Sequence, residues 1–202
     1  MEQRFEVRRR ELIEDCRVGP ETFEGAEARL EAFAATFLDA FESQADRRDG
    51  RAYLAGLLSD LPRKNAEAIA YRHGSDRQKI QEFIAVAAWK REPLARELVA
   101  QVARTLGRAD AVIVFDPSAF AKKGTASVGV QRQWCGRLGK VENCQVGVYM
   151  AYVTADEHVL VDTRLFLPRD WAASHARRKA CGVPAGVEFR TRHQLALEML
   201  DA

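Results

Sequence analysis

The chain has 202 residues, with 31 Lys and Arg against 29 Asp and Glu and a formal net charge of +2. Because the balance is close to neutral, the total charge gives no indication of nucleic-acid binding. Only local basic patches can indicate it. The apolar stretches are too short to cross a bilayer, and residues 1–6 lack the apolar core of a secretory signal, so we expect a cytoplasmic protein that makes no membrane contact.

The first half of the chain shows helical periodicity almost throughout. Gly50 is expected to end one helical unit, Asp76 to cap another, and Pro93 to lie in the first turn of a last helix that stops at Gly107. The pattern predicts about five helices in a compact bundle, forming a helical domain over residues 1–108. The expected helical segments are 21–41, 53–58, 64–71, 77–89 and 93–106.

After Gly107 the periodicity changes to that of strands. Residues 111–115 are β-branched and aromatic and predict a buried strand that ends directly at Asp116. Residues 117–140 are rich in Gly, Ser and basic residues and predict a long loop or irregular hairpin. Two further strands and a final helix with Thr191 as N-cap complete the predicted second domain, 109–202, and the fold class is α+β. These last elements are expected at 145–154, 158–167 and 191–200.

Asp116 is the strongest candidate for a catalytic residue and metal ligand. A carboxylate at the end of a buried strand lies where open α/β sheets keep their chemistry, and hard divalent cations prefer carboxylate oxygens. The alternative is a structural role, because Asp-Pro is a common turn opener and Pro117 follows.

The segment from residue 122 to residue 140 is basic and contains no acid. One interpretation is a loop that holds the phosphates of DNA beside the metal site; the other is an ordinary solvated loop. A second basic segment, at 169–190, is expected to be solvated. The candidate DNA-binding residues are Lys122, Lys123, Arg132, Arg137 and Lys140.

The remaining polar and aromatic side chains favour structural roles. The cysteines are scattered and indicate reduced, buried thiols, and the histidines share no helical face at short spacing. Four amides are expected to brace a hairpin, and the three tryptophans to pack. These residues are Cys16, Cys135, Cys144, Cys181, His73, His158, His175, His193, Gln131, Gln133, Asn143, Gln145, Trp89, Trp134 and Trp171.

Several sequence blocks from Tyr53 onward resemble the N-terminal half of bacterial insertion-sequence transposases of the Asp-Asp-Glu class, which carry a DDE superfamily endonuclease domain. The number of blocks in series makes the resemblance specific. The blocks are Tyr53–Leu58, Arg63–Asn65, Val114–Asp116, Lys122–Gly124, Ser127–Trp134, Gly139–Gln145, Leu165–Pro168 and Trp171.

The resemblance implies a ribonuclease-H-like domain that cleaves and joins DNA at transposon ends with two Mg²⁺ (or Mn²⁺) ions held by three carboxylates. Asp116 matches the first carboxylate, although Pro117 and Ser118 stand where the family commonly has a second Asp and a Thr. The second Asp and the Glu are expected beyond Ala202, so we expect an incomplete domain that is inactive alone.

Partners implied by the resemblance are double-stranded DNA at transposon ends and a second copy of the chain or a full-length relative, and the helical half resembles a DNA-end-binding domain. Two alternatives stay open. The chain could be a non-catalytic DNA-binding or inhibitory fragment of a transposase. It could also be a fold that shares only the α+β layout.

Overall fold

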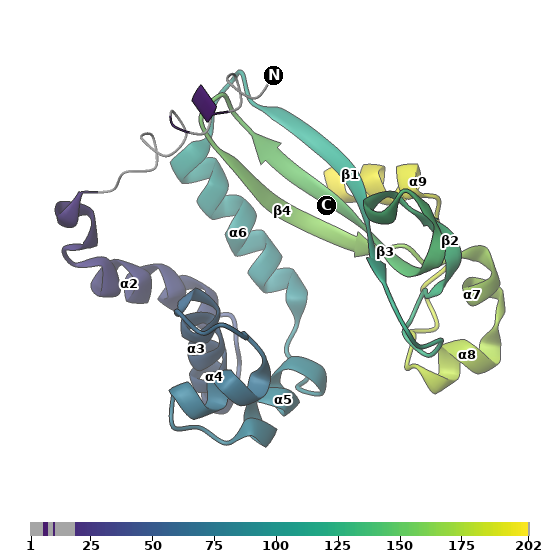
Figure 1. The fold of residues 1–202 in the computed structure, drawn as a ribbon, viewed down its shortest axis with the longest axis horizontal. Helices are drawn as coiled ribbons and strands as arrows, with labels where there is room; N and C mark the ends of the chain where they lie inside the picture. The colour runs from purple at the N-terminus through teal and green to yellow at the C-terminus, as the bar shows by residue number, and fades with distance from the viewer. Residues whose placement is uncertain (1–5, 8–9, 11–18, 202) are drawn as a thin grey trace. The chain divides into compact units, whose positions relative to one another are not determined.

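The computed structural model describes residues 6–7, 10 and 19–201. They form helices followed by an antiparallel sheet with further helices, which confirms the α+β class (Figure 1). The chain divides into two compact units, Met1–Leu94 and Ala95–Ala202. This division falls inside helix α6 (Arg91–Leu106), earlier than the expected domain boundary at residue 108, because the second half of α6 packs in the core of the second unit.

The first unit is built from short helices around an aromatic core. Asp76 caps α5 as expected, since its carboxylate accepts a hydrogen bond of 2.7 Å from the Gln78 N–H. Leu38, Phe41 and Phe83 are buried together in the core. The elements before α6 are η1 (Pro20–Phe23), α2 (Ala26–Leu38), α3 (Gln44–Leu58), α4 (Ala66–Arg72) and α5 (Arg77–Ala85).

Gly50 does not end a helix, so that expectation is wrong. It lies within α3 and is buried, and a Cβ added there would stand 3.1 Å from the Phe83 ring and 3.3 Å from Leu38. The missing side chain therefore lets α3 approach its neighbours closely. The helix expected to reach Trp89 ends at Ala85, and the Trp89 indole folds back to donate a hydrogen bond of 2.8 Å to the Phe83 carbonyl.

The second unit contains a four-stranded antiparallel sheet with β3 at its centre. β1 pairs with β3 alone, while β2 and β4 pair with the first and second parts of β3 (Figure 1). The expected hairpin of β3 and β4 is confirmed. The segment 117–140, expected to be a long loop or an irregular hairpin, contains the end of β1 and all of β2, which pairs antiparallel with β3. The strands are β1 (Val112–Ala121), β2 (Gln131–Cys135), β3 (Lys140–Val153) and β4 (His158–Leu165).

One face of this sheet is covered by helices. Val148 and Met150 of β3 pack with Val102 of α6 and with Leu195 and Met199 of α9 (Arg192–Leu200). Thr191 caps α9 as expected and forms a capping box with Gln194. Because successive side chains of a strand alternate between faces, the odd-numbered residues of β3 lie on the opposite face.

Two short helices that the sequence reading did not anticipate follow the sheet: α7 (Arg169–Ala173) and α8 (His175–Ala180). Trp171 anchors them, since its ring is only 1% exposed and its indole N–H donates a hydrogen bond of 2.7 Å to the Val130 carbonyl. The Arg177 guanidinium lies 3.8 Å from the centre of this ring. These contacts fix the chain after the sheet against the segment that leads into β2.

Candidate functional site

Asp116 lies in the middle of β1, not at its end, and Val112 and Val114 of this strand are exposed, so both the expected boundary and the expected burial of the strand are wrong. The strand continues through Pro117 to Ala121, and Asp116 pairs in register with Tyr149. Proline is tolerated here because β1 is an edge strand among the described residues, and some N–H groups of an edge strand point away from its single partner. The carboxylate is therefore presented by the face of a strand.

The face that carries Asp116 is the one opposite the helix-covered core. Its register partner Tyr149 belongs to the odd-numbered residues of β3, whereas the neighbours Val148 and Met150 are buried under the helices. Asp116 is exposed and, in the described part of the chain, forms neither a hydrogen bond nor an ion pair. It is thus an ionisable oxygen donor that is available to a ligand.

Two aromatic side chains share the sheet face that carries Asp116. The rings of Phe120 and Tyr149 lie 6.5 Å apart, and a Cβ placed on Gly147 would stand 2.9 Å from the Tyr149 ring. The Tyr149 ring therefore lies over Gly147, along the strand and away from the position directly opposite Asp116. Gly147 is required because any side chain there would displace this ring.

The basic loop that follows β1 is fastened to β3. The Lys122 N–H donates to the Asn143 carbonyl at 2.9 Å, and the Asn143 amide donates to the carbonyls of Lys122 (2.7 Å) and Gly124 (2.9 Å). Gln145 donates to the Val128 carbonyl at 2.6 Å. The expectation that these amides brace the structure is confirmed for Asn143 and Gln145. Both belong to the Asp116 face.

The predicted DNA-binding side chains are exposed. In the described part of the chain, no ion pair engages Lys122, Lys123, Arg132 or Arg137. Lys140 differs, because its ammonium lies 3.1 Å from the Glu142 carboxylate. These positions therefore present four cations to solvent and a fifth that an acid partly neutralises.

Glu142 is a carboxylate held in its charged form. The Asn143 N–H donates to it at 2.9 Å, and this hydrogen bond, followed by the Lys140 ammonium and the Arg132 charge, lowers the pKa of Glu142. Glu142 therefore keeps its negative charge throughout the neutral range and opposes the basic residues beside it.

The basic loop does not lie directly beside Asp116. At about 3.3 Å per residue in a strand, the step from Asp116 to Lys122 along β1 corresponds to about 20 Å. The structure therefore separates a carboxylate position from a cationic position on the same strand. A ligand that contacts both positions must extend for about 20 Å along β1.

The metal site implied by the family resemblance is only partly represented. Asp116 has the exposed carboxylate that suits Mg²⁺ or Mn²⁺. The described residues contain no group of three or more His, Cys, Asp or Glu side chains arranged to hold a metal ion. One donor of the expected set is present, and no catalytic step is assigned to this donor alone.

The second basic segment was expected to be solvated, but contacts within the fold engage much of it. Arg177 lies over the Trp171 ring and donates to the Val130 carbonyl at 3.4 Å, while Arg178 donates to the carbonyls of Pro184 (2.9 Å) and Ala185 (3.0 Å). Because their guanidinium groups already bind groups of the fold, they contribute less to the binding of an external anion.

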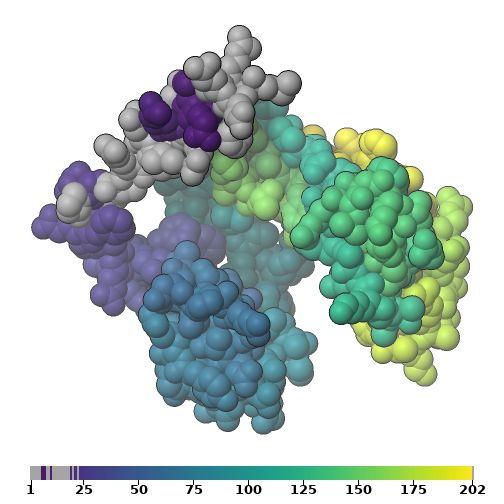
Figure 2. Space-filling view, in the orientation of Figure 1, coloured from purple at the N-terminus to yellow at the C-terminus, as the bar shows by residue number. Residues whose placement is uncertain are grey.

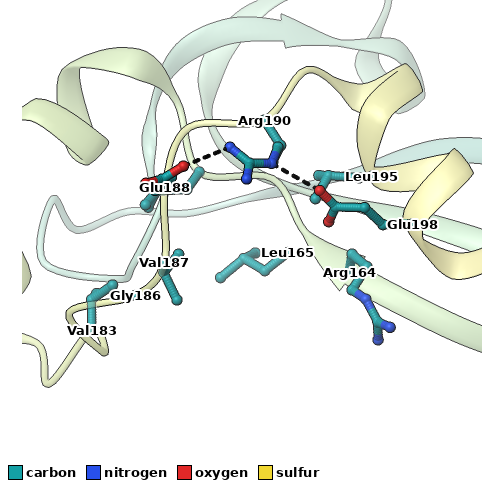
Figure 3. Close-up of a pocket in the computed structure, with 10 residues that line it drawn as sticks. Arg164, Leu165, Val183, Gly186, Val187, Glu188, Arg190, Leu195 and Glu198 are labelled. Carbon is teal, nitrogen blue, oxygen red and sulfur yellow. Dashed lines mark hydrogen bonds and ion pairs between the residues drawn. The ribbon is translucent and has the colours of Figure 1, made fainter. Parts of the chain in front are cut away.

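A pocket of about 420 Å³ opens between the end of β4, residues 183–190 and α9 (Figure 3). Arg190 lines it and is held at 2.9 Å by Glu188 and at 2.8 Å by Glu198, as the dashed lines show. This cation already has two carboxylate partners, so the pocket offers a polyanion little net attraction. Asp116 does not line it.

The cysteines in the part of the chain that the structure describes are free thiols, as expected. Cys135 and Cys144 are buried and Cys181 is half-buried, whereas Cys16 lies outside the described residues. Burial raises the pKa of Cys144, which keeps this thiol protonated. Together with the burial of Cys135 in β2 and Cys144 in β3 in one core cluster, this indicates that both are packing side chains.

Trp134 is the residue whose setting the sequence reading missed. It was expected to pack, yet its side chain is 57% exposed on β2, opposite Val141 of β3, which is 51% exposed. No periodicity within the short segment 131–135 distinguishes an inward from an outward tryptophan. The green segment that contains β2 and η2 (Gly136–Leu138) lies on the visible surface in Figure 2.

Comparisons with known proteins identify the family. The model of the DDE superfamily endonuclease family matches residues 36–202. The chain is 30% identical, over 145 residues, to a protein described as the probable transposase for insertion sequence element IS701 of Microchaete diplosiphon; the match covers 70% of this chain and 34% of the relative. The chain thus spans about a third of that relative's length. No solved structure matches the chain.

The matched region begins within α2 and includes the whole sheet, the basic loop and Asp116. Among the described residues, no helix is long and apolar enough to cross a bilayer. With a family match over most of its length, the chain belongs to the DDE superfamily endonuclease family.

Proposed function

We propose that this chain is the N-terminal part of a DNA transposase whose complete form cleaves and joins DNA at transposon ends. The observation that carries the proposal is an exposed, unpaired carboxylate, Asp116, on a sheet face whose far end is basic. The similarity to an insertion-sequence transposase supports it. In this proposal the sheet is the opening part of a ribonuclease-H-like domain, and double-stranded DNA is the substrate.

Asp116 is proposed as the first carboxylate of the catalytic set, and as a ligand of Mg²⁺ or Mn²⁺ in the complete enzyme. Two-metal chemistry clamps the attacking and leaving oxygens between two cations, and several carboxylates must hold them. The described residues assemble no such set. We therefore propose that this chain binds DNA and does not cleave it by itself.

The basic residues are proposed to contact the DNA backbone, because phosphate contacts supply most of the sequence-independent affinity of DNA-binding proteins. Lys122 and Lys123 extend β1 beyond Asp116, and Arg132 lies on the next pairing of the sheet, opposite Asn143. This arrangement suits a backbone that runs along the strands and positions one phosphate near Asp116.

Binding of a labelled duplex, measured by fluorescence anisotropy across a series of salt concentrations, tests this proposal. We expect binding at low salt that weakens steeply as salt increases. Failure to bind any duplex at low salt would overturn the proposed function. Loss of affinity on removal of the basic side chains, with unchanged folding, would support it.

A second candidate is an inhibitory, non-catalytic fragment, which the incomplete carboxylate set favours. Such a chain would occupy transposon ends or pair with a full-length relative, or with a second copy of itself. Mixing the chain with an active relative and measuring DNA cleavage tests this second candidate. Lowered cleavage supports inhibition, and unchanged cleavage at saturating chain contradicts it.

A further inference from the structure

The exposed face of the sheet carries Trp134 at the opposite end from Asp116. Trp134 pairs with Val141, and Asp116 pairs with Tyr149. Paired residues of antiparallel strands share a face, and Val141 and Tyr149 are both odd-numbered residues of β3. The register of β3 with β1 and with β2 is continuous, so Trp134 and Asp116 lie on the same face.

Trp134 differs from the other two tryptophans in its contacts. The indole N–H groups of Trp89 and Trp171 donate to carbonyls of the fold. The indole of Trp134 is 57% exposed, and no described residue accepts a hydrogen bond from it. Leaving a large aromatic surface in water costs hydrophobic stabilisation, so its position favours a ligand with a flat apolar face.

The surroundings of Trp134 select the chemistry of that ligand. Arg132 precedes it on the same face of β2, and Arg137 follows in η2; neither forms an ion pair in the described part of the chain. Glu142 is the nearby acid, and it is paired with Lys140. A flat exposed ring on a segment that carries two available guanidinium groups suits a nucleobase whose flanking phosphates contact the arginines.

We propose that Trp134 is a stacking platform for an unpaired base of the bound DNA. The inference rests on the proposed function and deepens it. Along β3, the partners of Trp134 and Asp116 are separated by about 26 Å. At about 3.4 Å per nucleotide step, this places the unpaired base about eight base pairs from the phosphate at Asp116.

The test uses the whole chain, a single-stranded oligothymidylate, and two mixed-sequence duplexes that differ by one unpaired thymine. Binding is followed by intrinsic tryptophan fluorescence and by anisotropy of the labelled DNA. We expect oligothymidylate to quench the wild-type fluorescence and Trp134→Phe to abolish the quenching, because Trp89 and Trp171 are engaged in the fold.

Trp134→Ala is expected to weaken binding to oligothymidylate and to the duplex with the unpaired base by about five- to 150-fold, as loss of one stacked base does. Binding to the fully paired duplex should change little. Val114→Ala is the matched control, because it removes another exposed apolar side chain from the same face near Asp116. Its binding should equal that of the wild type.

The outcomes separate this inference from the proposed function. If Trp134→Ala binds every probe as the wild type does, while Lys122→Ala/Lys123→Ala loses duplex binding, the stacking role is overturned and the proposed function stands. If the wild type binds no DNA, both fail. If Trp134→Ala changes only self-association of the chain, the exposed ring belongs to a protein contact and the inference is overturned.

Discussion

Asn143 and Lys122 are joined by hydrogen bonds in both directions: the Lys122 N–H donates to the Asn143 carbonyl, and the Asn143 side-chain amide donates to the Lys122 carbonyl. The same amide also reaches the Gly124 carbonyl. A single side chain of β3 therefore fixes the start of the basic loop, and it does so from the sheet face that carries Asp116.

Replacing both loop lysines tests their contact with phosphate. Lys122→Ala/Lys123→Ala should weaken duplex binding and its dependence on salt. The salt dependence is the slope of log K against the logarithm of the salt concentration. Each lost phosphate contact reduces the size of this slope by about 0.9, so the double variant should reduce it by about 1.8. The measurement is anisotropy across a salt series. Lys179→Ala, which removes an exposed lysine of α8, is the charge-matched control. Equal slopes for the double variant and the wild type would contradict the assignment.

Removing the Asn143 amide should loosen the loop without removing charge. Asn143→Ala loses the two side-chain hydrogen bonds and should lower the free energy of unfolding by about 1–3 kcal/mol, at about 0.5–1.5 kcal/mol each. Urea denaturation measures this. Duplex affinity should fall while the salt slope stays that of the wild type, because the cations remain. A stability equal to that of Gln131→Ala, a neighbouring β2 amide, would show that Asn143 does not hold the loop.

Gly129 should tolerate no side chain. Its φ is +77°, and a Cβ would stand 2.8 Å from the Phe166 carbonyl oxygen. Gly129→Ala should therefore destabilise the fold by at least about 1–2 kcal/mol, the typical cost of a left-handed conformation for a residue with a Cβ. Gly124→Ala is the control, because nothing lies within 4 Å of its added Cβ. Similar melting temperatures for the two variants would refute this account of the turn.

If the chain binds DNA as proposed, removal of the Glu142 charge should strengthen the binding. Glu142→Gln should raise duplex affinity several-fold at pH 7 by deleting a negative charge beside Lys140 and Arg132. Since the pKa of Glu142 lies below the ordinary Glu value of about 4.3, Glu142 stays predominantly charged at pH 5, so the difference in affinity between the wild type and Glu142→Gln should persist at that pH. Anisotropy at pH 7 and pH 5 measures it. Equal affinities of the wild type and Glu142→Gln for the duplex, at pH 7 and at pH 5, would contradict this role.

The same pKa shift has a consequence for stability. A lowered pKa in the folded state contributes stability above the unfolded-state pKa, and that contribution is lost as pH falls through the folded-state pKa. Wild-type stability relative to Glu142→Gln should therefore decrease as the solution is acidified below the ordinary Glu range. Urea denaturation as a function of pH follows it, and a gap that widens on acidification would be the wrong sign.

Local signals in the sequence predicted the elements whose ends are set locally. Asp76 and Thr191 cap their helices through their own side chains, and the hairpin of β3 and β4 follows from two strand-like runs around a polar turn. The extension of β1 through Pro117 could not be read locally, because pairing with β3 overrides the turn tendency of Asp-Pro. Gly50 was misread since its close neighbours come from other helices.

Residue type and order are enough to propose Asp116 and the basic residues as site residues, but not to predict their arrangement. That Trp134 shares the face of Asp116 depends on two strand registers against β3, and these are tertiary facts. The same applies to the second basic segment, where Trp171 and the carbonyls that occupy Arg177 and Arg178 come together only in the folded chain.

Incubation of supercoiled plasmid with the chain in Mg²⁺ or Mn²⁺, run beside a binding assay on the same plasmid, tests the central claim most directly. A lone exposed carboxylate on a DNA-holding face should give a bound plasmid that stays supercoiled, in the wild type and in Asp116→Asn alike. Relaxed plasmid that forms with the wild type and disappears with Asp116→Asn would show that the described residues already complete a cleavage site, contrary to this account.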